Sequence, residues 1–400
     1  MSLTAQHHFL AGKRIIICGG GIGGTVFCIA LQQFLNKHGQ NIQPRPRIDL
    51  YERETSADAI GREGYSLSIR DDGMSTGLQT LQKLGILDEM IAESNSGTHF
   101  TLFNADFTPL VETKKLASSI EGLPQTLMRI ARSKLRQILL KHMPSCVTMH
   151  WNCGVISAHE EQDGTVLVDF ENGKQERCDI LIAADGSNSK IRKVLRPEHE
   201  LNFAGAVCIM ARTHPLEKLP PPIDVSWGRV FSGTGNFLFI APSDRTSIVW
   251  IVSYRSDTPR ETKVAGTMTD AEIDQILAEA KERTKSCSEP MPTVLKQTLR
   301  SSIAISNAKE VIPFRNHGSV IFIGDAQHAI SLFGGNGANM AIMDGYQLAE
   351  QLVNANSLAE AIKGYDDQTV PRSTKAINIS HRIIEMGHSL GSWNSTWQLS

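Results

Sequence analysis

The stretch KRIIICGGGIGGTVFCIALQQF, Lys13 to Phe34, decides the fold of this chain. Its β-branched run, Arg14–Cys18, is typical of a central parallel strand. Gly19, Gly21 and Gly24 then fit the pattern GxGxxG, and the apolar residues that follow have helical spacing. A strand, a glycine turn and a helix in this order place the free N–H groups of the helix N-terminus toward a pyrophosphate.

An acidic residue at the end of the next strand supports this interpretation. Ile48–Tyr51 is expected to form a short strand that ends at Glu52. A carboxylate there can accept hydrogen bonds from both hydroxyls of a ribose. The spacing exceeds the usual value of about 20 residues, because a polar loop at residues 36–47 holds the extra length. The alternative for Glu52 is a solvated strand end.

Composition excludes several classes of protein. The 400 residues carry a net charge of −2 and no basic block, which excludes a nucleic-acid partner. The seven cysteines show no CxxC pair and no metal spacing, so we expect reduced thiols, no metal site and a cytoplasmic location. Glycines interrupt the most apolar stretch, so no window supplies the roughly 20 apolar residues of a membrane span. The N-terminus lacks the pattern of a signal peptide.

Two further turns follow predicted buried strands. Ile180–Ala184 is expected to lead into Asp185-Gly186, and a second buried strand leads into Gly324-Asp325. A glycine-rich loop at residues 334–337 then opens a helix at Ala338-Asn339. The pattern therefore predicts three turns, far apart in the sequence, that each follow a strand.

The segments between these turns predict a second layer of structure. Residues 201–255 alternate as the long strands of a sheet that faces something on one side. Helices are expected at about Gly73 to Leu84, after the capping residue Thr269, and in one long segment at the end of the chain.

The three motifs in this order resemble those of the group A FAD-dependent aromatic monooxygenases, the para-hydroxybenzoate hydroxylase-like superfamily, over nearly the whole chain. The resemblance implies an α/β fold with a Rossmann-like FAD-binding domain of the GR2 type, an inserted β-sheet substrate domain and a long C-terminal helix. The division it implies assigns 12–84, 110–197 and 303–340 to the FAD-binding domain, 85–109 and 198–302 to the substrate domain, and 341–400 to a C-terminal helical segment.

The resemblance also implies how FAD would be held. The glycine turn would cradle the pyrophosphate, Glu52 would bind the adenosine ribose, and Arg53 would lie near the adenine. Arg132 would contact the flavin side, Asp185 is tied to both FAD and NAD(P)H, and Asp325 would hold the ribityl chain. The complete set of predicted cofactor residues is Gly19, Gly21, Ile22, Gly23, Gly24, Glu52, Arg53, Arg62, Ser68, Arg132, Asp185, Asp325, Gly335, Asn336, Gly337, Ala338 and Asn339.

The loop at residues 335–339 would line the isoalloxazine ring. Reduced flavin carries negative charge near N1 and O2, and a helix that begins at Gly337 would favour this anion by about 1–2 kcal/mol. Glycines at Gly335 and Gly337 let the backbone approach a flat ring without an intervening Cβ.

Within this superfamily, GRVFSGTGNFLFIAP at residues 228–242 and the short C-terminal end are similar to the tetracycline-inactivating monooxygenases. Met210 stands where those enzymes tend to have a polar contact, which argues against a tetracycline-like substrate. Ser331-Leu332 replaces the usual proline pair, so the loop after Asp325 is expected to be less rigid. The predicted substrate residues are Met210, Arg229, Phe231, Phe239, Phe333 and Gly334.

Alternation along the strands predicts the wall of a pocket. Met210, Arg229, Phe237 and Trp250 each lie on the apolar face of their strand. A face with Phe, Trp, Met and an occasional arginine suits an aromatic or polycyclic substrate with an acidic or carbonyl handle. The alternative is that these aromatic residues are plain core.

The resulting hypothesis is an FAD-dependent monooxygenase that consumes NAD(P)H. The reduced flavin would add O₂ to give a C4a-hydroperoxide, whose distal oxygen goes to the substrate, so no catalytic side chain is assigned. His328 is interpreted as a structural histidine bonded within the Gly324-Asp325 turn.

Several alternatives stay open. Hydroxylation, epoxidation and Baeyer–Villiger insertion are not separated by the sequence. A flavin-dependent reductase or oxidase on the same scaffold, and a flavin-binding protein without turnover, are the rival functions. The expected partners are O₂ and a small aromatic molecule, and the expected state is a monomer or weak oligomer.

Overall fold

The computed structural model describes residues 7–57, 66–72, 74–95, 99–112, 122–123 and 128–391. At its centre is a parallel sheet of five strands. In sheet order these are β17 (Val320–Phe322), β11 (Ile180–Ala183), β1 (Arg14–Cys18), β2 (Arg47–Tyr51) and β7 (Val147–His150). Both faces of this sheet are covered, which explains why β1 is a continuous β-branched run rather than an alternating one.

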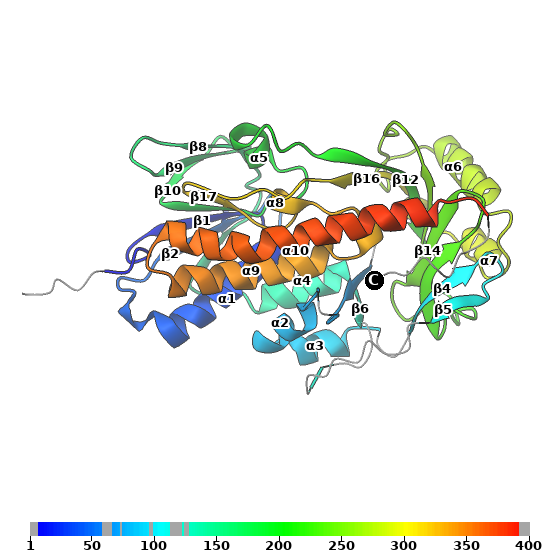
Figure 1. Cartoon of the computed structure of the whole chain (residues 1–400), viewed down its shortest axis with the longest axis horizontal. Helices are drawn as coiled ribbons and strands as arrows, with labels where there is room; N and C mark the ends of the chain where they lie inside the picture. Colours follow the sequence, from blue (N-terminus) through cyan, green and yellow to red (C-terminus); the bar gives the residue numbers. More distant parts are fainter. Residues whose placement is uncertain are drawn as a thin grey trace, which may run out of the picture.

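Helices cover one face of the parallel sheet and a small antiparallel sheet covers the other. Ile15 and Ile17 pack in one core with α1 (Ile22–His38) and α9 (Gly337–Asn354), which lie against each other. Ile16 points the other way, into a core shared with the small sheet. That sheet consists of β8 (Val155–Glu160), β9 (Val166–Phe170) and β10 (Gln175–Cys178). Figure 1 shows α1, α9 and α10 side by side.

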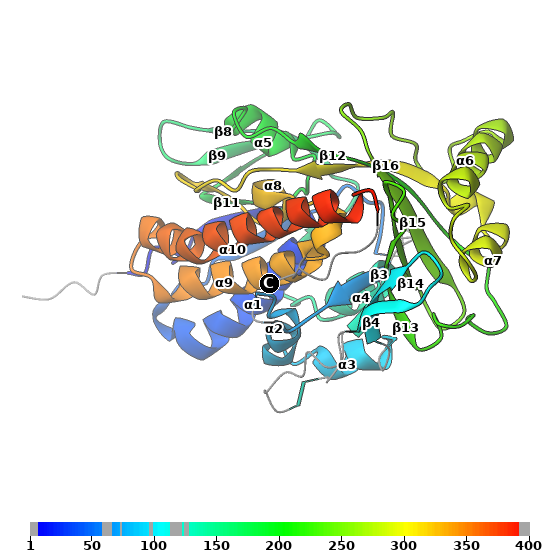
Figure 2. The same cartoon turned by 45° about the vertical axis from the view of Figure 1, so that its right-hand side comes forward.

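A larger sheet of seven strands forms the second part of the molecule. In sheet order its strands are β16 (Ala304–Glu310), β12 (Asn202–Arg212), β15 (Ile248–Arg255), β14 (Asn236–Pro242), β13 (Ser226–Phe231), β4 (His99–Asn104) and β5 (Pro109–Glu112). Its outer face packs on α6 (Asp270–Arg283) and α7 (Met291–Lys296), which Figure 2 shows beyond the sheet. Thr269 caps the start of α6, as the sequence predicts, and the structure shows a complete capping box with Glu272.

A two-stranded ribbon and short helices complete the fold. The ribbon pairs β3 (Ser66–Ile69) with β6 (Met128–Ala131) in antiparallel register. The expected helix at 73–84 begins only at Gly77. The remaining helices, 3₁₀ turns included, are α2 (Gly77–Lys83), α3 (Leu87–Ala92), α4 (Arg132–Lys141), α5 (Lys190–Leu195), α8 (Asp325–His328), η1 (Gly39–Asn41), η2 (Arg300–Ser302) and η3 (Leu332–Gly334).

The last helix, α10 (Leu358–Gly387), spans the length of both parts. It runs along α9 and continues to the seven-stranded sheet (Figure 1). Near its end, Ile383 and Ile384 share a core with Phe237 of β14. Among the described helices, none is long and apolar enough to cross a membrane.

The architecture confirms the expected α/β fold with a second, β-rich part and a long C-terminal helix. The sheet membership of β16 differs from the implied division, because residues 304–310 pair with β12 of the larger sheet. The boundaries of the division stay a prediction.

Candidate functional site

The glycine turn after β1 requires its glycines for steric reasons. Gly19 has φ +112°, and a Cβ there would overlap the carbonyl oxygen of Ala184 on the neighbouring strand. A Cβ at Gly24 would overlap the carbonyl oxygen of Gly19. Because glycine has no Cβ, α1 can pack close to β1 at this position. Gly21, the N-cap of α1, instead faces open space, since no other described part of the chain comes within 4 Å of its Cβ position. The turn is therefore tight on its protein side and open at the helix N-terminus, where Ile22 and Gly23 form the first turn.

Glu52 lies directly beside this turn. Its Oε2 accepts a hydrogen bond of 2.6 Å from the N–H of Gly20, and its Oε1 accepts one of 3.0 Å from the N–H of Glu54. The residue is 8% exposed, so it is not the solvated strand end of the alternative interpretation. Arg53 next to it is exposed, and Arg62 lies outside the described residues.

Asp185 follows β11, immediately across from the glycine turn. Its Oδ2 accepts a hydrogen bond of 2.9 Å from the N–H of Lys190. Its Oδ1 is buried and has no hydrogen-bond partner among the described residues. Burial raises the pKa of this carboxyl group, although its hydrogen bonds act in the opposite direction. A polar ligand that donates to Oδ1 would satisfy this buried acceptor.

Arg192 holds the second and third turns together. Its guanidinium is buried and donates to the carbonyl oxygens of Ser187, at 2.5 Å, and Ala326, at 2.8 Å. These two carbonyl groups belong to the segments that follow Asp185 and Asp325. Arg192 thus fixes the two carboxylate-bearing turns relative to each other.

Asp325 occupies the third turn, after β17. Gly324 before it has φ +57° and ψ −141°, a conformation that glycine adopts without strain. Burial raises the pKa of Asp325, while the charges of His328 and Arg132 oppose this shift. A Cβ at Gly337 would lie 3.7 Å from Asp325 Oδ1, so this carboxylate lies beside the N-terminus of α9.

His328 has the structural role expected of it, with a different partner. Its Nε2 lies 2.6 Å from Oδ2 of Asp344 in α9, rather than within the Gly324-Asp325 turn. The same oxygen accepts from the N–H of Gly324 at 2.9 Å, and Arg372 of α10 donates to Oδ1 of Asp344 at 2.6 Å. Asp344 therefore anchors the turn that carries Asp325.

The loop before α9 is open on one side and fastened on the other. Gly335 has φ +62°, and among the described residues none beyond its chain neighbours comes within 4 Å of its Cβ position. Asn336 and Asn339 are buried, whereas Ala338 is half-buried. The Nδ2 group of Asn339 donates to the carbonyl oxygen of Ser68 at 2.8 Å. The predicted Ser68 thus meets the predicted loop through its main chain.

These features fit a dinucleotide such as FAD. A helix N-terminus with an uncovered glycine can accept a pyrophosphate. Glu52 lies beside this turn at the end of β2, the position at which an acidic residue binds a ribose in dinucleotide-binding folds. Among the described residues, Oδ1 of Asp185 has no hydrogen-bond partner and could accept a hydrogen bond from the ligand. The Cβ positions of Gly186 and Gly335 have no described neighbours, so the turns leave space for it.

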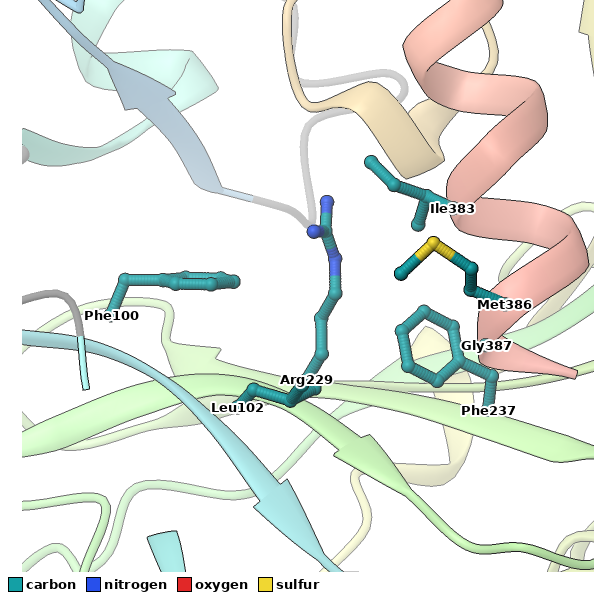
Figure 3. Close-up of a pocket in the computed structure, with 7 residues that line it drawn as sticks. All are labelled: Phe100, Leu102, Arg229, Phe237, Ile383, Met386 and Gly387. Atoms are coloured by element: carbon teal, nitrogen blue, oxygen red, sulfur yellow. The ribbon is translucent and has the colours of Figure 1, made fainter. Parts of the chain in front are cut away.

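A pocket lies between the seven-stranded sheet and the end of α10. The pocket is small and partly open to solvent. Figure 3 shows the Arg229 side chain rising from the sheet, with Phe100 on one side and Phe237, Ile383 and Met386 on the other. The wall is therefore apolar and aromatic around a single guanidinium.

Arg229 points from this pocket toward the loop before α9. Its Nη2 donates to the carbonyl oxygen of Phe333, and its guanidinium lies 5.4 Å from the centre of the Phe100 ring. Burial and then the charge of Arg70 lower the pKa of Arg229 to about 10. An anionic or carbonyl group in the pocket would offset the cost of this buried charge.

The other predicted substrate residues lie around this pocket rather than on its surface. Met210, Phe231 and Phe333 belong to the core that also holds Phe237 and Ile383. Phe239 packs with Trp227 farther along the sheet. The Cβ position of Gly334 faces α10, 3.6 Å from the carbonyl oxygen of Ala376. Their contacts with a substrate stay a prediction.

The expected orientation of Trp250 is wrong. Trp250 lies in the core beneath α6 and α7, where its Nε1 donates to Thr298 Oγ1 at 3.1 Å. Val249 and Ile251 of the same strand point to the opposite face. Alternation identifies which residues share a face, but it does not tell which face covers the site.

Sequence reasoning also missed Phe100, Arg70 and the α10 residues at the pocket. Arg70 directly follows β3, and its position at the end of a strand is the one sequence feature that could have marked it as a site residue. Ile383 and Met386 carried no signal beyond helical spacing. In the described part of the chain, no group of three or more His, Cys, Asp or Glu side chains is arranged to hold a metal ion.

The three turns at strand ends are typical of the dinucleotide-binding class of proteins. Comparison with known proteins makes this specific. A family described as "FAD binding domain" matches residues 69–380. "Monooxygenase cfoF" of Aspergillus candidus is 31% identical over 397 residues, which cover 96% of this chain and 93% of that protein. The chain belongs to this FAD-binding family, and it is an FAD-dependent monooxygenase.

Solved structures share the fold. HpxO of Klebsiella pneumoniae, in complex with FAD and uric acid, has a TM-score of 0.76 at 19% identity, over 95% of this chain and 90% of that one. Tetracycline destructase Tet(55) has a TM-score of 0.70 at 20% identity, over 98% and 93% of the two chains. The resemblance to aromatic and tetracycline-inactivating monooxygenases is thus confirmed at the level of the fold.

Proposed function

We propose that this enzyme uses NAD(P)H and O₂ to insert one oxygen atom into an aromatic or polycyclic small molecule with an acidic or carbonyl group. FAD, when bound, supplies the electron transfer from NAD(P)H to O₂ and the delivery of the oxygen atom. One observation carries the proposal: Arg229 lines an aromatic pocket and also donates to Phe333, beside the loop that would face the flavin.

The residues of the chain then have separate tasks. The glycine turn and Glu52 would hold the dinucleotide, and the N-terminus of α9 beside Asp325 would hold its flavin end. Phe100 and Phe237 would stack on or flank the substrate ring, while Arg229 would orient its polar group. The apolar wall from Ile383 and Met386 would exclude water from the reacting atoms.

The purified protein tests this proposal directly. We expect bound FAD, and NADPH or NADH oxidation that polycyclic phenols stimulate, with products that gain one atom from isotopically labelled O₂. Substrate-stimulated oxidation without an oxygenated product would instead favour the reductase or oxidase alternative. Bound FAD without any NAD(P)H consumption would favour the non-catalytic alternative.

The Asp325→Ala variant tests the assigned cofactor site. We expect it to bind FAD about tenfold or more weakly, because a carboxylate that accepts hydrogen bonds from a ligand contributes about 1.5–3 kcal/mol. Fluorescence titration of the apoprotein measures this, and the exposed Asp257→Ala serves as the control. Full flavin occupancy in Asp325→Ala would remove Asp325 from the site.

A further inference from the structure

Arg70, directly after β3 of the β3–β6 ribbon, forms hydrogen bonds with the loop before α9. Its Nη2 lies 3.2 Å from the carbonyl oxygen of Gly334 and 3.3 Å from that of Gly335, and it also donates to Oδ1 of Asn336. The side chain is 19% exposed. One guanidinium therefore contacts three consecutive residues of the loop that would line the flavin ring.

The main chain and neighbours of Arg70 hold the same loop. The N–H of Arg70 donates to Oδ1 of Asn339 at 2.9 Å, and Ser75 Oγ donates to Oδ1 of Asn336 at 2.9 Å. A Cβ at Gly77 would overlap the Asn339 amide, so α2 approaches α9 as closely as a glycine allows. The segment after β3 thus fixes both the N-cap and the first turn of α9.

Two cations converge on this loop. Arg229 donates to Phe333, one residue before the contacts of Arg70. Among the described residues, Asp72 is the only carboxylate within ion-pair distance of either guanidinium group, with its Oδ2 3.4 Å from Nε of Arg70. This Nε group makes no hydrogen bond to any described residue. Burial lowers the pKa of Arg70, and Asp72 opposes the shift. The positive charge at the start of α9 is therefore only partly neutralised.

We propose that Arg70 is a positioning residue for the flavin, which fastens the 334–336 loop through its carbonyl groups and favours the reduced, anionic cofactor through its charge. This inference rests on the proposed function, since it concerns the same cofactor site. The geometric and electrostatic roles are separable, because lysine keeps the charge of arginine but cannot bridge the same carbonyl groups.

The experiment compares Arg70→Lys and Arg70→Gln with the wild-type holoenzyme. The matched control is Arg45→Gln, because Arg45 donates to the carbonyl oxygen of Leu35 at the end of α1, away from the three turns. For each protein we would measure the FAD dissociation constant of the apoprotein, the two-electron reduction potential of the bound flavin, and the thermal midpoint.

We expect both Arg70 variants to bind FAD roughly three- to tenfold more weakly, as one to two lost hydrogen bonds imply. Only Arg70→Gln should lower the reduction potential, whereas Arg70→Lys should keep it close to the wild-type value. Arg45→Gln should change neither quantity.

Two results would overturn the inference. The first is wild-type FAD affinity and potential in Arg70→Gln. The second is an equal fall of FAD affinity and thermal midpoint in both variants with an unchanged potential, which would mark Arg70 as merely structural. If the wild-type protein itself binds no FAD, the proposed function fails first, and the inference fails with it.

Discussion

At the scale of single residues, buried guanidinium groups distinguish this site. Arg229 donates to a main-chain carbonyl group and also lines the pocket (Figure 3). Among the described residues no carboxylate pairs with Arg229, and burying an unpaired arginine is costly. A ligand with a negative or carbonyl group would offset this cost.

The Arg229→Ala variant should therefore lose substrate recognition. We expect KM for any substrate found by the NAD(P)H screen to rise roughly tenfold or more, or more hydrogen peroxide to form per NAD(P)H, because a charged hydrogen bond contributes about 1.5–3 kcal/mol. Steady-state kinetics and peroxide assays measure these effects, with the exposed Arg245→Ala as the control. Unchanged kinetics in Arg229→Ala would exclude it from the pocket.

Residues also show how far the sequence alone predicts the site. The glycine turn, Glu52 and Asp325 are predictable because each lies within a local strand–turn pattern. The contact between Arg70 and Gly334 joins positions 264 residues apart, and no local pattern contains it. The predicted orientation of Trp250 is wrong for a related reason, since only the tertiary structure decides which face of a strand is covered by which element.

At the scale of elements, α10 ends in a buried histidine that docks it on the sheet. His388 Nδ1 lies 2.7 Å from the carbonyl oxygen of Ile384, and its Nε2 lies 2.9 Å from Ser253 Oγ on β15. Neutral imidazole donates from Nδ1 to the Ile384 carbonyl group, and its Nε2 competes with the carbonyl oxygen of Phe237, 2.7 Å from Ser253 Oγ, for the single hydroxyl proton of Ser253. Burial lowers the pKa of His388 to about 4.

Acid should therefore weaken this docking. The unfolded chain takes up a proton near pH 6.5, whereas folded His388 does so only near pH 4, so stability is lost as the pH falls through this window. The loss amounts to about 3 kcal/mol at most. Urea unfolding across this pH range should give a flatter profile for His388→Gln than for wild type or the exposed His214→Gln. Parallel profiles for all three proteins would contradict the assignment.

At the scale of the whole molecule, the β3–β6 ribbon joins the two sheets. The buried Arg129 guanidinium donates to Ser68 Oγ at 2.8 Å and lies 4.8 Å from the centre of the Trp227 ring and 5.4 Å from that of Phe239. Burial lowers its pKa to about 9. A cation stacked on two aromatic rings couples the ribbon to the seven-stranded sheet.

Loss of this stacked cation should destabilise the folded protein. We expect Arg129→Met to lower the free energy of unfolding by about 2 kcal/mol, from the lost cation–π contacts and the unpaired Ser68 hydroxyl. Flavin release and tryptophan fluorescence, followed together in urea, should separate into two transitions. Coincident curves at the wild-type midpoint, matching the exposed Arg177→Met control, would argue against this role.

Helix α10 has a practical consequence for protein engineering. Arg372 donates to Asp344, which anchors the third turn. Ile383 and Met386 line the pocket about three to four turns farther along the same helix. Libraries directed at the distal turns can therefore alter substrate range while leaving cofactor retention intact, and libraries directed at the proximal turns would do the reverse.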